Sequence, residues 1–116
     1  MEDKLFGMLG IARRAGKITF GFDAVVRSVT EGTAFLVLMS QDVAERTERQ
    51  TIRACDENSV KAMKTKKSML DIGYAIGRGS TAVLSVTDSS IAAKLEELCR
   101  DKGEERTDYD DKVQGS

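Results

Sequence analysis

Apolar residues recur every three or four positions in five segments of the chain, which is the spacing of an amphipathic helix. The first predicted helix runs from about Asp3 to Ala15 and stops at Gly16, a residue typical of helix C-termini. The second follows Gly21 and ends near Gly32. The remaining three are predicted over about 42–57, 68–76 and 88–98.

Short polar residues mark the predicted helix starts. Asp42 and Ser68 each stand three residues before an acid, which is the spacing of a capping box. Asp88 directly precedes the last helical pattern and is expected to cap it. Asn58 is expected to end the third helix in the left-handed conformation that asparagine tolerates.

Four shorter segments between the helices carry strand patterns. Residues 17–20 alternate between polar and apolar, as an edge strand does, and 60–63 form a short, partly apolar strand. The runs 34–39 and 82–86 are largely apolar and bounded by turn residues, which is typical of buried parallel strands. Alternating helices and strands predict an α/β fold, a three-layer α/β/α sandwich around a mostly parallel mixed central sheet. No internal repeat or linker is visible, so we expect a single domain over 1–100.

The composition excludes several kinds of active site. The 116 residues include no His, which removes imidazole-based catalysis and His-ligated zinc. Cys55 and Cys99 are isolated and far apart, so we expect free, buried thiols in a reducing compartment. Gly73, Gly77 and Gly79 follow a helix instead of a strand, which indicates close packing and a turn, not a phosphate-binding loop. We therefore expect no catalytic residues, no metal and no cofactor.

The two ends of the chain bear on location and charge. The opening residues lack the basic and apolar regions of a signal peptide, and the longest apolar run, 34–39, is too short to span a bilayer. We expect a soluble, cytoplasmic protein without membrane contact. Residues 101–116 contain six acids, three bases and few apolar residues, so an acidic disordered tail is expected. The tail carries −3, which leaves +2 on 1–100.

Two groups of basic residues fall where an α/β sandwich places ligands, at strand ends and helix starts. One group surrounds Gly21, since glycine lets a phosphate backbone approach the N-terminus of the second helix. Asp23 lies within this group and opposes an anion. The other group lies before the fourth helix. The candidate nucleic-acid contacts are Arg13, Arg14, Lys17, Gly21, Asp23, Arg27, Lys64, Lys66 and Lys67.

Two other functions remain open on the same pattern. Asp42 and Asp88 each follow a strand expected at the centre of the sheet, where paired carboxylates can hold Mg²⁺ for phosphoryl transfer or nucleotide binding. Helix capping explains both acids without a metal. A protein-docking module on the same fold is the other alternative. The enzyme requires the two acids to converge on one cleft, whereas RNA binding requires the basic groups to share one face.

Several segments, 12–17, 34–42, 72–77 and 83–88, together with Gly21 and Arg27, resemble the ribosomal protein L7Ae family in its small bacterial YlxQ-like branch. The resemblance extends over about Lys4 to Leu98. It implies an α/β/α sandwich that binds RNA without enzymatic activity, commonly at kink-turns and related internal loops. The expected partners are structured RNA and the ribosome or translation machinery, and no DNA is expected.

Position by position, the resemblance places Gly21 where the family's backbone approaches RNA. Asp23 stands where many members have Asn, Ala24 where they have Glu, and Arg27 where they have Lys. Residues 65–67 stand where kink-turn binders have small or apolar residues against an extruded nucleotide, yet two of the three are lysines. These departures favour general RNA binding through phosphates over strict kink-turn specificity.

Overall fold

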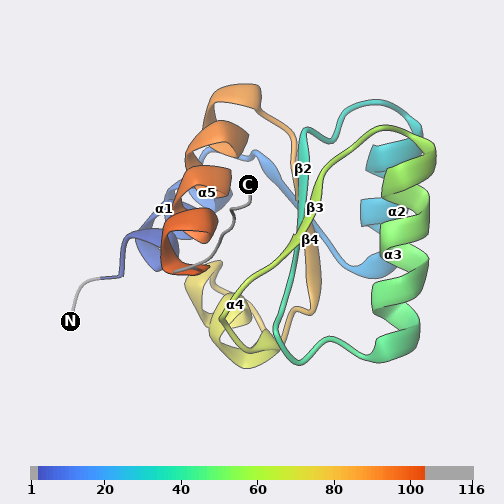
Figure 1. Ribbon diagram of the computed structural model, residues 1–116. Helices are drawn as coiled ribbons and strands as arrows, with labels where there is room; N and C mark the ends of the chain where they lie inside the picture. Colours follow the sequence, from blue (N-terminus) through green and yellow to red (C-terminus); the bar gives the residue numbers. More distant parts are fainter. Residues whose placement is uncertain (1–2, 104–116) are drawn as a thin grey trace, which may run out of the picture.

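The computed structural model describes residues 3–103, in which four strands form one sheet between two layers of helices (Figure 1). Helices α1, α4 and α5 cover one face of the sheet, and α2 and α3 cover the other. The predicted three layers and the alternating order of elements are confirmed. In chain order the elements are α1 (Lys4–Arg14), β1 (Ile18–Phe20), α2 (Phe22–Thr30), β2 (Leu36–Met39), α3 (Glu45–Glu57), β3 (Ala62–Lys64), α4 (Met69–Ala75), β4 (Val83–Val86) and α5 (Ser89–Gly103).

The sheet is mixed, but the prediction that it is mostly parallel is wrong. Its strand order is β1-β4-β2-β3, and β4 runs antiparallel to both of its neighbours, β1 and β2. The parallel pairing is that of β2 with β3. Apolar composition misleads here because a strand buried on both faces reads the same in either direction.

The short connection before β4 sets the direction of that strand. Helix α4 has seven residues, so it is about 10 Å long. The turn after it folds back until the Thr81 amide donates to the Met69 carbonyl at the start of α4 (2.9 Å). Gly73 permits this return, because a Cβ there would lie 2.0 Å from the Gly79 carbonyl oxygen. The chain therefore begins β4 at the edge where it left β3, and the packing role predicted for Gly73 is confirmed.

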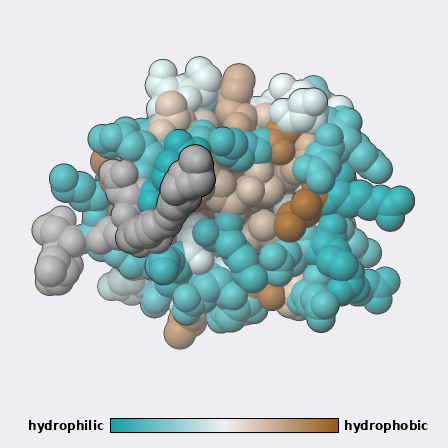
Figure 2. Space-filling view, in the orientation of Figure 1, coloured by the Kyte–Doolittle hydropathy of each residue, from teal (hydrophilic) through white to brown (hydrophobic). Residues whose placement is uncertain are grey.

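A hydrophobic core lies on each face of the sheet. Along β2, Leu36 and Leu38 belong to the core under α1, α4 and α5, while Val37 and Met39 belong to the core under α2 and α3. The alternation follows from the two-residue period of a strand, which sends successive side chains to opposite faces. Figure 2 shows the outer face of α3 covered with hydrophilic side chains, as expected for a helix that buries one side only.

The predicted caps are confirmed at α4 and α5 but not at α3. Ser68 and Asp88 each accept a hydrogen bond from the amide three residues further on (3.1 and 2.9 Å). Helix α3 begins only at Glu45 and has no side-chain cap. Asp42 instead accepts from the amide of Met69 at the start of α4 (2.8 Å). The prediction that Asp42 caps a helix start is therefore right in kind, but the helix is α4 and not α3.

Three further predicted boundaries, at the ends of α3, β3 and α5, differ in the structure. The left-handed residue after α3 is Ser59 (φ 59°), since Asn58 has φ −118°. Lys64 is the last residue of β3 and not part of the loop after it. Helix α5 continues to Gly103, so 101–103 are helical although the sequence placed them in the acidic tail. The rest of that predicted tail, 104–116, lies outside the described residues.

Cys55 and Cys99 are free and buried, as predicted. Burial raises the pKa of each thiol to about 11, so both stay protonated and unreactive at neutral pH. Among residues 3–103, no helix combines the length and the apolar character needed to cross a bilayer.

Candidate functional site

Four loops meet at one edge of the sheet, at the bottom of Figure 1. Strands β1, β2 and β3 run in the same direction, so their carboxyl ends share this edge with the amino end of β4. We call it the loop edge; it consists of Gly21, 40–44, 65–68 and 76–82. Because β1 and β3 are the outer strands, Gly21 and Lys66 occupy opposite corners, separated by three inter-strand spacings or ~14 Å. Parts of the two predicted basic groups therefore share one edge.

Gly21 leaves the start of α2 open to a ligand. Its φ of 92° favours glycine, its amide donates to the Val83 carbonyl (3.2 Å), and no side chain caps the first N–H groups of α2. A Cβ at this position would have no atom within 4 Å, so the residue faces open space. Beside it lies a pocket of about 220 Å³, lined by the starts of α2 and α3 and by 78, 80–83. Free N–H groups and the positive end of the helix dipole suit this position to an anion.

Two arginines lie over one aromatic ring at this corner. The Cζ atom of Arg13 is 4.8 Å from the centroid of the Phe20 ring, and the Cζ atom of Arg78 is 4.1 Å from it. The Nε of Arg13 also donates to the Ile76 carbonyl (3.2 Å). Neither arginine takes part in the ion pairs found within the described chain. We call Arg13, Phe20 and Arg78 the arginine corner.

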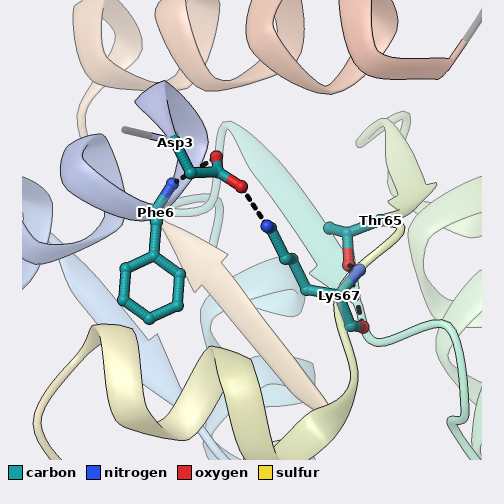
Figure 3. Close-up of polar contacts among 4 residues, drawn as sticks. All are labelled: Asp3, Phe6, Thr65 and Lys67. Atoms are coloured by element: carbon teal, nitrogen blue, oxygen red, sulfur yellow. Dashed lines mark hydrogen bonds and ion pairs between the residues drawn. The ribbon is translucent and has the colours of Figure 1, made fainter. Parts of the chain in front are cut away.

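The lysine corner, Lys64, Lys66 and Lys67, lies at the other end of the loop edge. Lys67 forms an ion pair with Asp3 at the start of α1 (Figure 3). The Nζ of Lys64 lies 3.2 Å from a carboxylate oxygen of Glu48 on α3. Lys66 is exposed and has no acidic partner among the ion pairs of residues 3–103. Acids thus neutralise two of the three predicted lysine contacts.

The other predicted contacts are spread over the molecule. Lys17 lies at the opposite edge of the sheet, where its carbonyl accepts from the Thr87 amide (2.9 Å). Arg14 is exposed in the last turn of α1. Asp23 and Arg27 are exposed one turn apart on α2, with Asp23 nearer the loop edge. Of these four residues, the structure brings Asp23 and Arg27 onto the helix that starts at the loop edge, and it separates Lys17 from that edge.

Sequence reasoning missed Arg78. The pattern of its segment, Gly77 to Ser80, predicts only a turn. A single arginine between two glycines in a loop is nevertheless a sequence signal for a candidate anion contact. Its proximity to Phe20 depends on the return of the chain after α4, which no local pattern shows.

The acids of the magnesium hypothesis lie too far apart to share an ion. Asp42 follows β2 at the loop edge, whereas Asp88 follows β4, which is antiparallel and ends at the opposite edge. The Ser40 hydroxyl near Asp42 and the hydrogen bond from the Met69 amide (2.8 Å) lower the pKa of Asp42. Each acid is already engaged at a helix start. The hypothesis is therefore wrong for this pair, because it assumed that both strands point the same way.

The fold and the loop edge define a small α/β/α domain with an open helix start and two basic corners at one end of the sheet. The chain belongs to the ribosomal protein L7Ae/L30e/S12e/Gadd45 family, which it matches over residues 3–96. The family resemblance expected from the sequence is confirmed.

Two relatives agree with this assignment, and two solved structures share the fold. The RNA-binding protein YlxQ of Bacillus subtilis (strain 168) is 32% identical over 90 residues, which cover 78% of this chain and 89% of YlxQ. The large ribosomal subunit protein eL8 of Picrophilus torridus is 28% identical over 89 residues, 76% of this chain and 69% of eL8. A Bacillus halodurans protein of unknown function superposes with a TM-score of 0.81 at 28% identity, over 84% of this chain and 98% of its own. The Giardia lamblia 15.5kD RNA binding protein shares the fold, with a TM-score of 0.66 at 21% identity over 84% and 92% of the two chains.

Proposed function

We propose that the protein binds structured RNA through the loop edge and acts by binding alone, without catalysis. The observation that carries the proposal is the meeting of an open helix start at Gly21 with cations at both corners of one edge that have no acid partner within residues 3–103. The family assignment supports it, as does the 32% identity to YlxQ, which is named an RNA-binding protein.

In this proposal phosphate groups bind first at the N–H groups that begin α2. Arg27, exposed on the same helix, adds a cation further along the RNA backbone. Lys66 reaches the backbone from the opposite corner, ~14 Å away by strand spacing. Contacts of this kind fix the position of the RNA and carry little sequence information.

The finer part of the proposal concerns which RNA is bound. Asp23 is exposed in the first turn of α2, where its carboxylate can accept hydrogen bonds from a guanine edge and repels phosphate. A kinked internal loop exposes base edges at such a point, whereas a regular duplex presents phosphates. We therefore propose a preference for a kink-turn or a related internal loop, without strict specificity, since Ala24 and the lysines of 65–67 depart from the pattern of kink-turn binders. Association with the ribosome is proposed from the family and from the eL8 relative.

The proposal is tested by titrating the full chain with a kink-turn RNA and with a fully paired duplex of equal length at two salt concentrations. We expect tighter binding of the kink-turn RNA and a steep salt dependence for both, because each phosphate contact releases counterions. Equal, weak binding of the two RNAs would contradict the kink-turn preference. Absence of binding to either would contradict RNA binding itself. Cosedimentation with ribosomes tests the ribosomal part separately.

One observation favours the alternative role in protein docking. Leu70 and Tyr74 on α4 are 67% and 77% exposed, and the Tyr74 ring lies 5.7 Å from the Phe6 ring. An exposed apolar ridge of this kind suits a protein partner. The double variant Leu70→Ser, Tyr74→Ser separates the two roles: unchanged RNA affinity places the ridge outside the RNA surface, and a loss of affinity makes it part of that surface.

A further inference from the structure

Arg13, Phe20 and Arg78 come from three separate elements and meet beside Gly21. Phe20 is the last residue of β1, Arg13 lies in the last turn of α1, and Arg78 lies in the turn between α4 and β4. Both guanidinium carbons lie within 4.8 Å of the same ring centroid. The ring of Phe20 therefore attracts two like charges at once.

Contact with the ring leaves most of each guanidinium free to bind. An aromatic ring attracts a cation through its face, whereas the five N–H donors of arginine point outward in the guanidinium plane. The Nε of Arg13 is occupied by the Ile76 carbonyl (3.2 Å). Neither arginine is paired with an acid in the part of the chain that the structure describes. Their charges are thus held in place without being neutralised.

The arginine corner borders the open start of α2. Arg78 lines the 220 Å³ pocket together with Gly21, which directly follows Phe20 in the chain. Arg78 and the free N–H groups of the α2 start therefore lie around one space, and Arg13 is held at the Phe20 ring next to it. A ligand with several closely spaced negative charges relieves the repulsion between the cations as it binds.

We propose that Phe20 is a positioning residue that holds Arg13 and Arg78 as a pair, and that this pair binds neighbouring phosphate groups of the RNA beside Gly21. The inference rests on the proposed RNA function and adds Arg78 as a contact and Phe20 as the residue that aims it. Arginine suits the position because its planar group stacks on a ring while several N–H donors stay free in the guanidinium plane.

The test compares variants of the full chain in titrations with the kink-turn RNA at two salt concentrations. Arg78→Ala is expected to weaken binding roughly tenfold or more and to make the salt dependence shallower by about one phosphate contact. Arg78→Lys should recover little of this loss. Phe20→Leu should weaken binding while thermal unfolding stays close to that of the parent, and Phe20→Tyr, which keeps the ring, should bind like the parent. Arg53→Ala is the control, because Arg53 is an exposed arginine on α3, more than two turns beyond the loop edge, and contacts no ring in the described structure.

Three results would overturn the inference. If Phe20→Leu lowers the unfolding temperature but leaves RNA affinity and salt dependence unchanged, the stack only ties α1 and the α4–β4 turn to the sheet. If Gly21→Glu abolishes binding while Arg78→Ala binds like the parent, RNA binds at the loop edge without the arginine pair, and the proposed function stands. If the parent binds neither RNA, the proposed function fails and the inference fails with it.

Discussion

At the arginine corner two cations lie over the ring of Phe20, whereas at the lysine corner Lys64 and Lys67 are paired with Glu48 and Asp3. A carboxylate holds a cation by cancelling its charge. A ring holds a cation through its quadrupole and leaves the charge in place. The two corners therefore carry similar numbers of basic residues but differ in how much of that charge a phosphate can use. Counting bases along a sequence does not distinguish them.

The acid partners at the lysine corner also serve the fold. Asp3 caps α1 by accepting from the Phe6 amide (3.2 Å), and its ion pair with Lys67 ties the start of that helix to the loop after β3 (Figure 3). The side chains of Lys67 and Asp3 are 23% and 22% exposed, so water screens this pair only in part. We infer that the lysine corner contributes mainly to stability and the arginine corner mainly to binding.

The largest expected effect comes from closing the turn that carries Arg78. In Gly73→Ala the new Cβ would lie 2.0 Å from the Gly79 carbonyl oxygen, so the return of the chain after α4 must shift. We expect a loss of stability of about 3 kcal/mol, the upper end of overpacking costs, measured by chemical denaturation. Gly79→Ala is the matched control, because a Cβ there meets nothing within 4 Å. Equal stability of the two variants would show that the turn does not depend on this contact.

The next effect concerns RNA binding at Gly21, next to the arginine corner. Gly21→Glu places bulk and a negative charge at the open start of α2 and should weaken RNA binding by about 2 kcal/mol, roughly thirtyfold in Kd. Gly32→Glu is the control, since Gly32 has a similar φ (81° against 92°) and open space around its Cβ position but lies at the other end of α2. Thermal unfolding of both variants is measured beside the titration, and a loss of RNA affinity in a variant that remains folded locates the site. Equal affinities would remove Gly21 from the interface.

A smaller effect distinguishes Lys67, which we expect to contribute to stability, from Lys66, which we expect to contribute to RNA binding. Lys67→Ala breaks the partly buried pair with Asp3 and should lower stability by about 1 kcal/mol with little change in RNA affinity. Lys66→Ala should leave stability unchanged and make the salt dependence of RNA binding slightly shallower, because Lys66 is exposed and free of an acid among the described ion pairs. Thermal unfolding and salt titration of both variants measure this. The reverse pattern would make Lys67 the RNA contact.

The smallest effect is a pH dependence of the stability, which comes from the carboxylate of Asp42 at the loop edge. The pKa of Asp42 is lowered in the folded protein, from 3.8, by the Ser40 hydroxyl near it and by the hydrogen bond from the Met69 amide. A carboxyl whose folded pKa is depressed stabilises the fold above its unfolded pKa, and this contribution is lost as pH falls through the folded value. The parent should therefore be slightly more stable than Asp42→Asn at neutral pH, and the difference should shrink below pH 3.8 and vanish once the pH has passed the lower, folded pKa. A difference that persists in acid would show that the charge of Asp42 is not its source.

Much of the fold could be predicted because it depends on local patterns. The spacing of apolar residues located every helix and strand of residues 3–103 to within a few positions. Capping chemistry placed the starts of α4 and α5, since a side chain that accepts from an amide three residues away needs no other part of the chain. Gly21 could likewise be singled out from sequence, because the chain passes from a strand directly into a helix there.

The sequence by itself determined which segments are helices and strands, which of their faces are buried, and which family the chain belongs to. Only the tertiary structure decided the direction of β4, and with it the separation of Asp42 from Asp88 and of Lys17 from the loop edge. It also decided which cations are neutralised and which are not. The physical reason is the same in each case: periodicity and capping act over one or two turns, whereas strand direction, ion pairs and the contact of Arg78 with Phe20 join residues far apart in the chain.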